Sequence, residues 1–284
     1  MGAYSRLVKP NEPSAKKRFG QHFLRDTGVL ERIVRWIEPS REDVILEIGA
    51  GDGALSVRLA PHVYRLLAIE IDSECIPHLE AALGSCNSAE IIKGDILQLK
   101  LSQFIAPHLQ AGKRLRLAGN LPYNIGTAII EKMLHQDTPV SDMAFMVQLE
   151  VAQRITAMPG TREYGYFSVE CQHHSDVRLG FKVSPACFVP RPKVCSAMVS
   201  LRPKPSPLDP AIEQDFEIIT KAAFSYRRKT IENSLSRHPI LGKISRCLLQ
   251  NAGIIGSRRA EELTVEEYEH LTKTYAELRT TIDH

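Results

Sequence analysis

A glycine-rich turn between an apolar run and a helical pattern constrains the fold of this chain more than any other feature. Residues 47–53 read Glu-Ile-Gly-Ala-Gly-Asp-Gly, after the apolar run 44–46 and before a helical pattern over 54–60. Glycines let the backbone turn tightly and approach a ligand near the positive end of the helix dipole. A dinucleotide site needs Gly-x-Gly-x-x-Gly, and here the third glycine comes one residue early. The spacing therefore favours S-adenosylmethionine over NAD.

Two acidic residues follow predicted strands at positions suited to the same cofactor. Residues 66–70 read as a strand ending in Glu70, where a carboxylate can chelate ribose hydroxyls. Asp95 follows a strand at 91–92 and is placed to meet the adenine amino group. A single acid at a strand end is more often a helix cap or a solvated loop residue. The carboxyl ends of parallel strands, however, meet at one edge of the sheet, where ligands bind.

The run Asn120-Leu121-Pro122-Tyr123 suits methylation of an exocyclic amino group on a nucleobase. The Asn120 amide oxygen and the backbone carbonyl beside Pro122 can accept the two amino hydrogens, while Tyr123 offers a face for the base. By itself, such a run also occurs as an ordinary turn with a buried aromatic residue. Its position after the glycine turn and the two acids favours the catalytic interpretation.

The hydrophobic pattern predicts an α/β domain followed by a small helical one. Strands are expected at 44–48, 65–71, 90–93, 114–119 and 142–148. Helical patterns such as 72–83 and 125–135 separate them, which predicts a mostly parallel, doubly wound, Rossmann-like sheet. Residues 177–183 and 194–201 predict an antiparallel hairpin at its edge. A first helix is expected after Asp26 as N-cap, ending at Pro39.

Prolines crowd residues 203–210, and only helical patterns follow, including a last helix over 265–278. We therefore expect a methyltransferase domain over 1–203, with a basic N-terminal arm, and an all-α domain over 208–284 that binds RNA or the ribosome.

Charge and cysteine usage narrow the class of protein. The net charge of +3 does not by itself indicate a nucleic-acid partner. Basic residues nevertheless cluster at 16–18, 113–114, 227–229 and 258–259. Such clusters are commonly solvated surface, but on one face they would form a phosphate track. The six cysteines show neither a Cys-x-x-Cys pair nor a zinc spacing, so we expect reduced thiols, no metal and a cytoplasmic protein. No apolar stretch is long enough to span a bilayer, and we expect no membrane partner.

Several segments spread over nearly the whole chain resemble the ribosomal RNA adenine dimethyltransferases, specifically their small-subunit type. They are residues 17–24, the glycine turn, 120–124, 188–194 and 227–235. The stretches Gly-Gln-His-Phe-Leu over 20–24 and Arg-Arg-Lys-Thr-Ile over 227–231 are more specific than the glycine turn. The chain departs from the family pattern at Cys195, where Asp is common, and at Gly126 and Ala128, which replace Ser and Pro.

The resemblance implies an enzyme that uses S-adenosylmethionine to dimethylate two adjacent adenosines. Its implied partner is the 3′-terminal hairpin of 16S ribosomal RNA in the immature small subunit, and we expect a monomer. His22 and Leu24 are implied to border the cofactor. Phe188 is implied to be a second aromatic wall for the adenine, with a core anchor for its loop as the alternative.

The residues assigned to each role are as follows. For catalysis, they are Asn120, Leu121, Pro122, Tyr123 and Phe188. For the cofactor, they are His22, Leu24, Gly49, Gly51, Glu70, Asp95 and Asn120. For RNA, they are Lys17, Arg18, Arg227, Arg228 and Lys229.

Two other functions remain open at this stage. A large-subunit methylase that confers macrolide resistance is related, but the stretch at 227–235 argues against it. A non-catalytic assembly factor could retain the fold, but it would have no use for Asn120, Tyr123, Glu70 and the glycine turn together.

Overall fold

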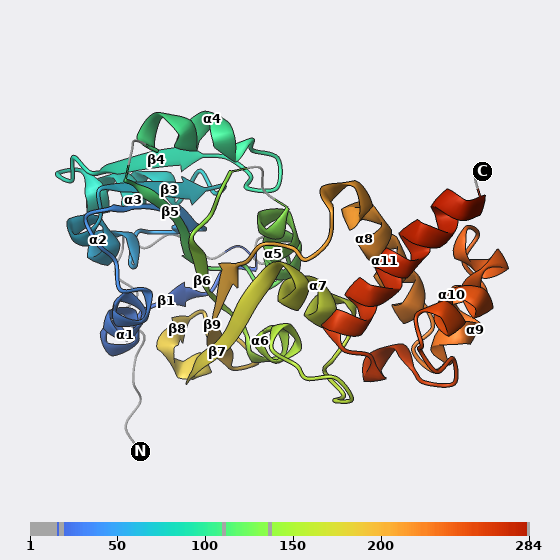
Figure 1. The fold of residues 1–284 in the computed structure, drawn as a ribbon. Coiled ribbons are helices and arrows are strands. Elements are labelled where there is room, and N and C mark those ends of the chain that lie inside the picture. The colour runs from blue at the N-terminus through green and yellow to red at the C-terminus, as the bar shows by residue number, and fades with distance from the viewer. Residues whose placement is uncertain (1–15, 17–19, 110–111, 136–137, 283–284) are drawn as a thin grey trace, which may run out of the picture. The chain divides into compact units, whose positions relative to one another are not determined.

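The computed structural model describes residue 16 and residues 20–282, except for 110–111 and 136–137. The chain divides into two compact units (Figure 1). The first extends to residue 149 and includes residues 179–202. The second contains residues 150–178 and extends from residue 203 onward.

A seven-stranded sheet forms the framework of the first unit, in the order β4-β3-β2-β5-β6-β9-β7. The strands are β2 Asp43–Ile48, β3 Arg65–Glu70, β4 Ala89–Lys93, β5 Arg114–Asn120, β6 Asp142–Gln148, β7 Ser175–Val183 and β9 Ser196–Pro203. Neighbours from β4 to β6 pair in parallel, whereas β9 pairs with β6 antiparallel. This confirms the predicted Rossmann-like sheet with an antiparallel part.

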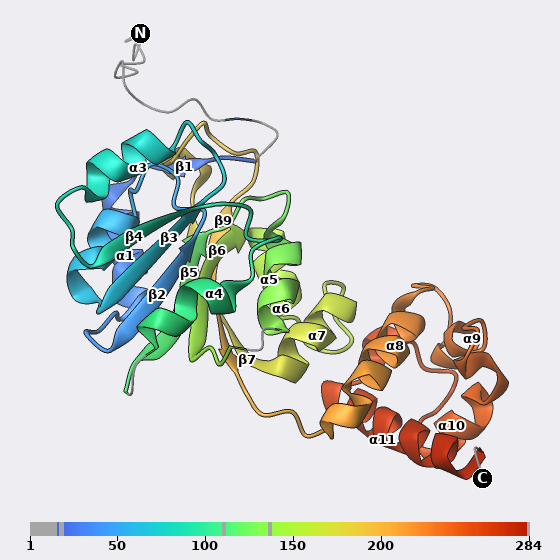
Figure 2. The same ribbon diagram turned by 90° about the horizontal axis from the view of Figure 1, so that it is seen from above.

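Helices cover both faces of the sheet, so the middle residues of its central strands are buried and mostly apolar. Leu46 of β2 pairs with Leu67 of β3 and with Leu117 of β5, and all three are buried. The helices are α1 Thr27–Ile37, α2 Ser56–Leu59, α3 Ile76–Leu83, α4 Leu101–Ile105 and α5 Gly126–Leu134. Figure 2 shows α1, α2 and α3 along one face, with α4 and α5 along the other.

Helix α1 begins and ends as its sequence predicts. The Asp26 side chain accepts a hydrogen bond from the Val29 backbone N–H at 2.9 Å, so it caps the first turn. Glu38, directly before Pro39, adopts a left-handed conformation with φ of 51° and ends the helix. Leu30, Ile33 and Ile37 form its buried face.

A second, two-stranded sheet joins segments that lie far apart in the sequence. In this sheet, β1 (Phe23–Leu24) pairs antiparallel with β8 (Phe188–Val189). The Arg25 backbone N–H also donates to the Cys187 carbonyl at 2.8 Å. Two of the segments that resemble the family, 17–24 and 188–194, therefore meet through these residues.

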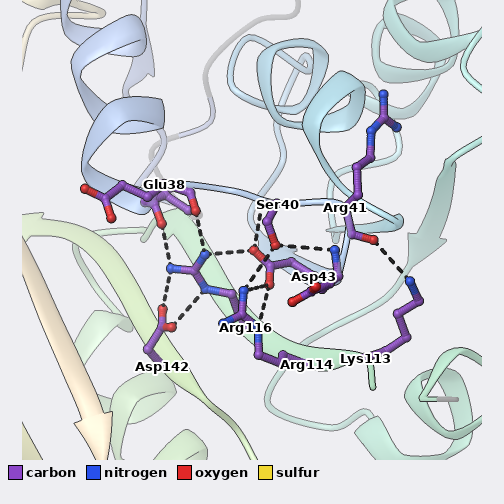
Figure 3. A network of polar contacts seen from close by, with 10 residues as sticks. Glu38, Ser40, Arg41, Asp43, Lys113, Arg114, Arg116 and Asp142 are labelled. Atoms are coloured by element: carbon purple, nitrogen blue, oxygen red, sulfur yellow. Dashed lines mark hydrogen bonds and ion pairs between the residues drawn. The ribbon is translucent and has the colours of Figure 1, made fainter. Parts of the chain in front are cut away.

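At the amino ends of β2, β5 and β6, a charge network ties the strands together (Figure 3). Arg116 contacts Asp43 and Asp142, each at 2.9 Å, and Arg114 contacts Asp43 at 2.8 Å. Arg116 also donates to the Ile37 carbonyl at 2.6 Å, which attaches the end of α1. Burial raises the pKa of Asp43, but hydrogen bonds, led by those from Arg116, outweigh it and hold this pKa below its ordinary value.

The second unit is helical and has its own apolar core. Its helices are α6 Leu149–Ile155, α7 Tyr166–His174, α8 Glu213–Phe224, α9 Ile231–Leu235, α10 Ser245–Asn251 and α11 Val265–Ile282. Phe216 of α8 and Tyr268 of α11 belong to this core and are almost completely buried. The Tyr268 hydroxyl donates to the Ala260 carbonyl at 2.8 Å, so its polar end is satisfied.

The division into units differs from the expected boundary near residue 203, because residues 150–178 group with the C-terminal helices. The physical reason lies in α7. The His173 ring stacks on Phe216 with 3.9 Å between centroids, and its nitrogens lie 2.8 Å from Glu269 and 3.1 Å from Glu213. Throughout the described part of the chain, no helix is both long and apolar enough to cross a bilayer.

Candidate active site

A cavity of about 270 Å³ opens at the carboxyl ends of β2, β3 and β5. Every residue assigned to the cofactor lines it, namely His22, Leu24, Gly49, Gly51, Glu70, Asp95 and Asn120. Leu121, Pro122 and Tyr123 line it as well. The structure thus brings two sets of residues into one cavity, and their individual roles stay predictions.

The glycine turn shapes one wall of this cavity. The Gly49 and Ala50 backbone N–H groups both donate to the Ile69 carbonyl at 3.0 Å, which ties the turn to β3. Gly51 adopts a left-handed conformation with φ of 60°, and a Cβ there would lie 3.2 Å from the Phe23 ring. The position therefore favours glycine, and both Gly49 and Gly51 line the cavity.

Glu70 connects the turn to the loop after β3. One carboxylate oxygen accepts from the Gly51 backbone N–H at 2.7 Å. The other accepts from the N–H groups of Ile71 and Asp72, at 2.9 and 2.8 Å. Burial raises the pKa of Glu70 despite these three donors. Since each oxygen has about two acceptor sites, the first can still receive a ribose hydroxyl.

Glu47, at the start of the glycine turn, received no role in the sequence analysis. Its side chain is buried and lines the cavity, and its Oε2 has no hydrogen-bond partner among the described residues. Burial raises its pKa to about 8, and the nearby negative charges of Glu70 and Asp52 add to this effect. No sequence pattern distinguishes Glu47 from an ordinary residue at the end of a strand, so its role could not be predicted.

Asn120, the last residue of β5, has its amide oriented by the N-terminal segment. Its Nδ2 donates to the His22 carbonyl at 3.0 Å. Its Oδ1 is buried and has no hydrogen-bond partner within the described part of the chain. A buried acceptor without a donor is costly unless a ligand supplies one. The side chain therefore suits an N–H donor entering the cavity.

Tyr123 is held on two sides. Its hydroxyl hydrogen-bonds to the hydroxyl of Ser196, and its ring lies 5.0 Å from the His22 ring, centroid to centroid. His22 is itself positioned by the Pro190 carbonyl, 2.7 Å from its Nδ1. Burial raises the pKa of Tyr123, so its hydroxyl is neutral at physiological pH.

Phe188 occupies a different environment from the one expected for a wall of the base pocket. It pairs with Leu24, is 2% exposed and belongs to the apolar core of the first unit. The cavity lining formed by the described residues does not include it. This burial agrees with the core-anchor alternative, and stacking of Phe188 on a base stays a prediction.

The residues assigned to RNA lie in two places. Lys17 and Arg18 fall outside the described residues. Arg227, Arg228 and Lys229 are exposed in the second unit, directly after α8. The Arg227 guanidinium donates to the Arg162 carbonyl at 3.1 Å. A phosphate backbone can reach these three exposed cations, and their role in RNA binding stays a prediction.

The Rossmann-like sheet, the glycine turn and the cavity at the strand ends define an S-adenosylmethionine-dependent methyltransferase. Residues 13–277 match the family model described as ribosomal RNA adenine dimethylase. The chain belongs to this family.

Curated relatives match over most of their length. The chain is 42% identical to the ribosomal RNA small subunit methyltransferase A of Legionella pneumophila (strain Lens), over 92% of this chain and 97% of that protein. It is 38% identical to the protein of the same name from Alkaliphilus metalliredigens, over 95% and 98%.

Solved structures agree on the fold. A dimethyladenosine transferase from Plasmodium falciparum superposes with a TM-score of 0.75 at 22% identity, covering 90% of this chain and 98% of that one. The 23S rRNA methyltransferase ErmE superposes with a TM-score of 0.68 at 25% identity, covering 89% and 98%.

Proposed function

We propose that this protein dimethylates the N6 amino groups of two adjacent adenosines in the 3′-terminal hairpin of 16S ribosomal RNA. One observation carries the chemical part of the proposal, namely the buried Oδ1 of Asn120 at the cavity, for which the described residues provide no hydrogen-bond donor. The choice of the small subunit is supported by relatives named for it at about 40% identity, against 25% for the 23S enzyme.

The cofactor fits the cavity because Gly49 and Gly51 line it without side chains and Glu70 retains an acceptor site. When bound there, S-adenosylmethionine supplies a methyl group on a positively charged sulfonium. Gly49, Gly51, Glu70 and Asp95 would hold it, with His22 and Leu24 bordering it. The task left to the protein is to place the acceptor nitrogen in line with that methyl group.

Asn120 prepares the nitrogen for attack. The lone pair of an adenine amino group is delocalised into the ring, which makes it a weak nucleophile. Hydrogen bonds from the amino group to Asn120 Oδ1 and to the carbonyl of Leu121 would favour a tetrahedral nitrogen and localise the pair. The Pro122 carbonyl already accepts from the Ile125 N–H at 3.2 Å, which uses one of its two acceptor sites and makes the Leu121 carbonyl the better candidate.

No general base is required in this mechanism. Once the nitrogen carries a new methyl group and a positive charge, its proton is acidic enough to leave to water. The Tyr123 hydroxyl is a poor base, because burial raises its pKa and keeps it protonated. Its ring instead replaces the stacking that the extruded adenine loses, at about 1–3 kcal/mol per base.

The wider setting forms part of the same proposal. The substrate is the immature small subunit in the cytoplasm, and the enzyme acts as a monomer without a metal. Lys17, Arg18, Arg227, Arg228 and Lys229 contact the RNA backbone. The exposed positions of the last three support this assignment.

Methyl transfer to purified ribosomal particles from an unmethylated strain tests the proposal. We expect dimethyladenosine at two adjacent positions in small subunits and none in large subunits. Transfer to large subunits alone would favour a 23S enzyme. Tight binding of small subunits without transfer, by protein that also binds the cofactor, would favour a non-catalytic assembly factor.

A further inference from the structure

Tyr123 sits in the loop after β5, yet its ring is anchored to a different strand. Its hydroxyl hydrogen-bonds to Ser196, the first residue of β9. Ser196 is completely buried and pairs with Gln148 at the end of β6. Because β5, β6 and β9 are neighbours in the sheet, this bond ties the Tyr123 ring to the framework that also carries Asn120.

The hydrogen bond to Ser196 restricts the orientation of the Tyr123 ring, on which the base is proposed to stack. A tyrosine on a loop can change rotamer, and each change moves its ring away from the plane that the base needs. The Ser196 bond holds the hydroxyl end of the side chain, while the His22 ring packs beside it. With both ends of the side chain fixed, the ring plane is set before the base arrives, which lowers the cost of ordering it during the reaction.

Ser196 itself is remote from the reacting groups. Within the described residues, the cavity lining includes Tyr123 but not Ser196. The Ser196 hydroxyl contacts Tyr123, so we expect its effect on methyl transfer to pass through the Tyr123 ring. This separates it from Asn120, whose own oxygen faces a ligand in the proposed function.

We propose that Ser196 is a positioning residue, whose hydroxyl fixes the plane of the Tyr123 ring on which the target adenine stacks. The inference rests on the proposed adenine methylation. It adds a link between the Asn-Leu-Pro-Tyr run and β9, the strand that follows the loop with Pro190 and Pro192.

The test compares Ser196→Ala, Tyr123→Phe and the double variant, with Ser200→Ala on the same strand as the matched control. Each single variant removes the same hydrogen bond from one side, so a fold defect specific to one of them cannot explain a shared effect. The measurements are kcat and KM on small subunits, cofactor affinity by calorimetry, and the fluorescence of 2-aminopurine placed at the target adenosine.

We expect Ser196→Ala and Tyr123→Phe each to lower kcat by roughly 3- to 10-fold, with cofactor affinity unchanged. The double variant should be no slower than either single one, because both remove one bond. Quenching of 2-aminopurine, which reports stacking, should weaken in all three. Ser200→Ala should match the wild type in every measurement.

Three results would overturn the inference, and they are distinguishable. If the wild type methylates small subunits but Ser196→Ala is as fast as Ser200→Ala, Ser196 does not position Tyr123 and the proposed function stands. Multiplicative losses in the double variant would likewise separate the two hydroxyls. If the wild type transfers no methyl group to small subunits, the proposed function fails and this inference fails with it.

Discussion

At the residue scale, the chemistry depends on the orientation of one amide. The His22 carbonyl accepts a hydrogen bond from Nδ2 of Asn120, and this leaves Oδ1 as the acceptor at the cavity. The hydrogen bond from the adenine amino group should strengthen as the nitrogen becomes tetrahedral. Such an interaction contributes more to the transition state than to binding.

We therefore expect Asn120→Ala to lower kcat on the order of 100-fold, while the affinities for cofactor and RNA change only a few-fold. Single-turnover kinetics with calorimetry of both ligands checks this. Asn233→Ala, in α9 of the second unit, serves as the control. Near-normal turnover together with a collapse of RNA binding would make Asn120 a binding residue instead.

Glu70 has two roles, one toward the cofactor and one toward the backbone, and its sequence position indicates only the first. It is expected to bind the ribose, and it also accepts three backbone N–H groups around the cavity. Glu70→Ala should weaken cofactor binding by about 1.5–3 kcal/mol for each charge-assisted hydrogen bond lost. It should also lower the melting temperature. Exposed Glu80 provides the control substitution, and unchanged affinity in a folded Glu70→Ala protein would refute the ribose assignment.

Glu47 gives the protein a pH dependence of known sign. Its pKa rises from an ordinary 4.5 to about 8 on folding, so the folded state holds a proton that the unfolded state releases. Its stabilising contribution is fully present below about pH 4.5 and is lost as the pH rises through about 8. Between these values, the slope is at most about 1.4 kcal/mol per pH unit.

Glu47→Gln removes this titration. In denaturant unfolding from pH 6 to 9, we expect the stability of the wild type to fall relative to that of Glu47→Gln. Parallel curves over this range would show that the Glu47 carboxyl does not change protonation on folding.

At the scale of elements, the sequence predicts features that depend on neighbouring residues, such as strands and helix caps. It does not predict pairing between segments that are far apart in the chain. The central strands are found within about two residues, because short, largely apolar segments mark strands that are buried on both faces. The Asp26 cap is equally local. The pairing of β1 with β8 joins short segments distant in sequence, so neither carries a pattern of its own.

The candidate site follows the same division. Strand order brings Gly49, Glu70, Asp95 and Asn120 to one edge, and this could be predicted from the alternation of strands and helices. Contacts between side chains could not be predicted from this alternation. The buried state of Phe188, the free oxygen of Glu47 and the Tyr123 to Ser196 bond all depend on packing between distant segments.

The charge network opposite the cavity is an element-scale device, because it joins three strands and the end of α1 (Figure 3). Asp43→Asn should destabilise the protein by about 1.5–3 kcal/mol, since it removes the negative charge that accepts from Arg114 and Arg116 but leaves the pair between Arg116 and Asp142. Chemical denaturation checks this, with neighbouring exposed Glu42→Gln as control. Activity of the folded fraction should be unchanged, and a loss confined to activity would contradict the structural role.

At the scale of the whole molecule, the question is how the enzyme selects its site. A pocket that reads one adenine carries too little information to choose among the many adenosines of ribosomal RNA. The remaining selection must come from the shape of the particle, through phosphate contacts spread over a wide surface. Arg227, Arg228 and Lys229 are exposed on the helical unit and suit such contacts.

Replacing Arg227, Arg228 and Lys229 together by alanine should weaken binding to immature small subunits and leave cofactor affinity intact. Each lost phosphate contact should reduce the slope of log K against log salt by about 1. The matched control replaces Lys243, Lys273 and Arg246, three exposed basic residues of the same unit, so the change in net charge is equal.

Methylation of the purified hairpin, compared with that of immature subunits, separates recognition from chemistry. The wild type should strongly prefer the particle, and the first triple variant should lose that preference while the control keeps it. Equal rates of the wild type on both substrates, or an unaltered salt slope in the first variant, would place the recognition surface elsewhere on the protein.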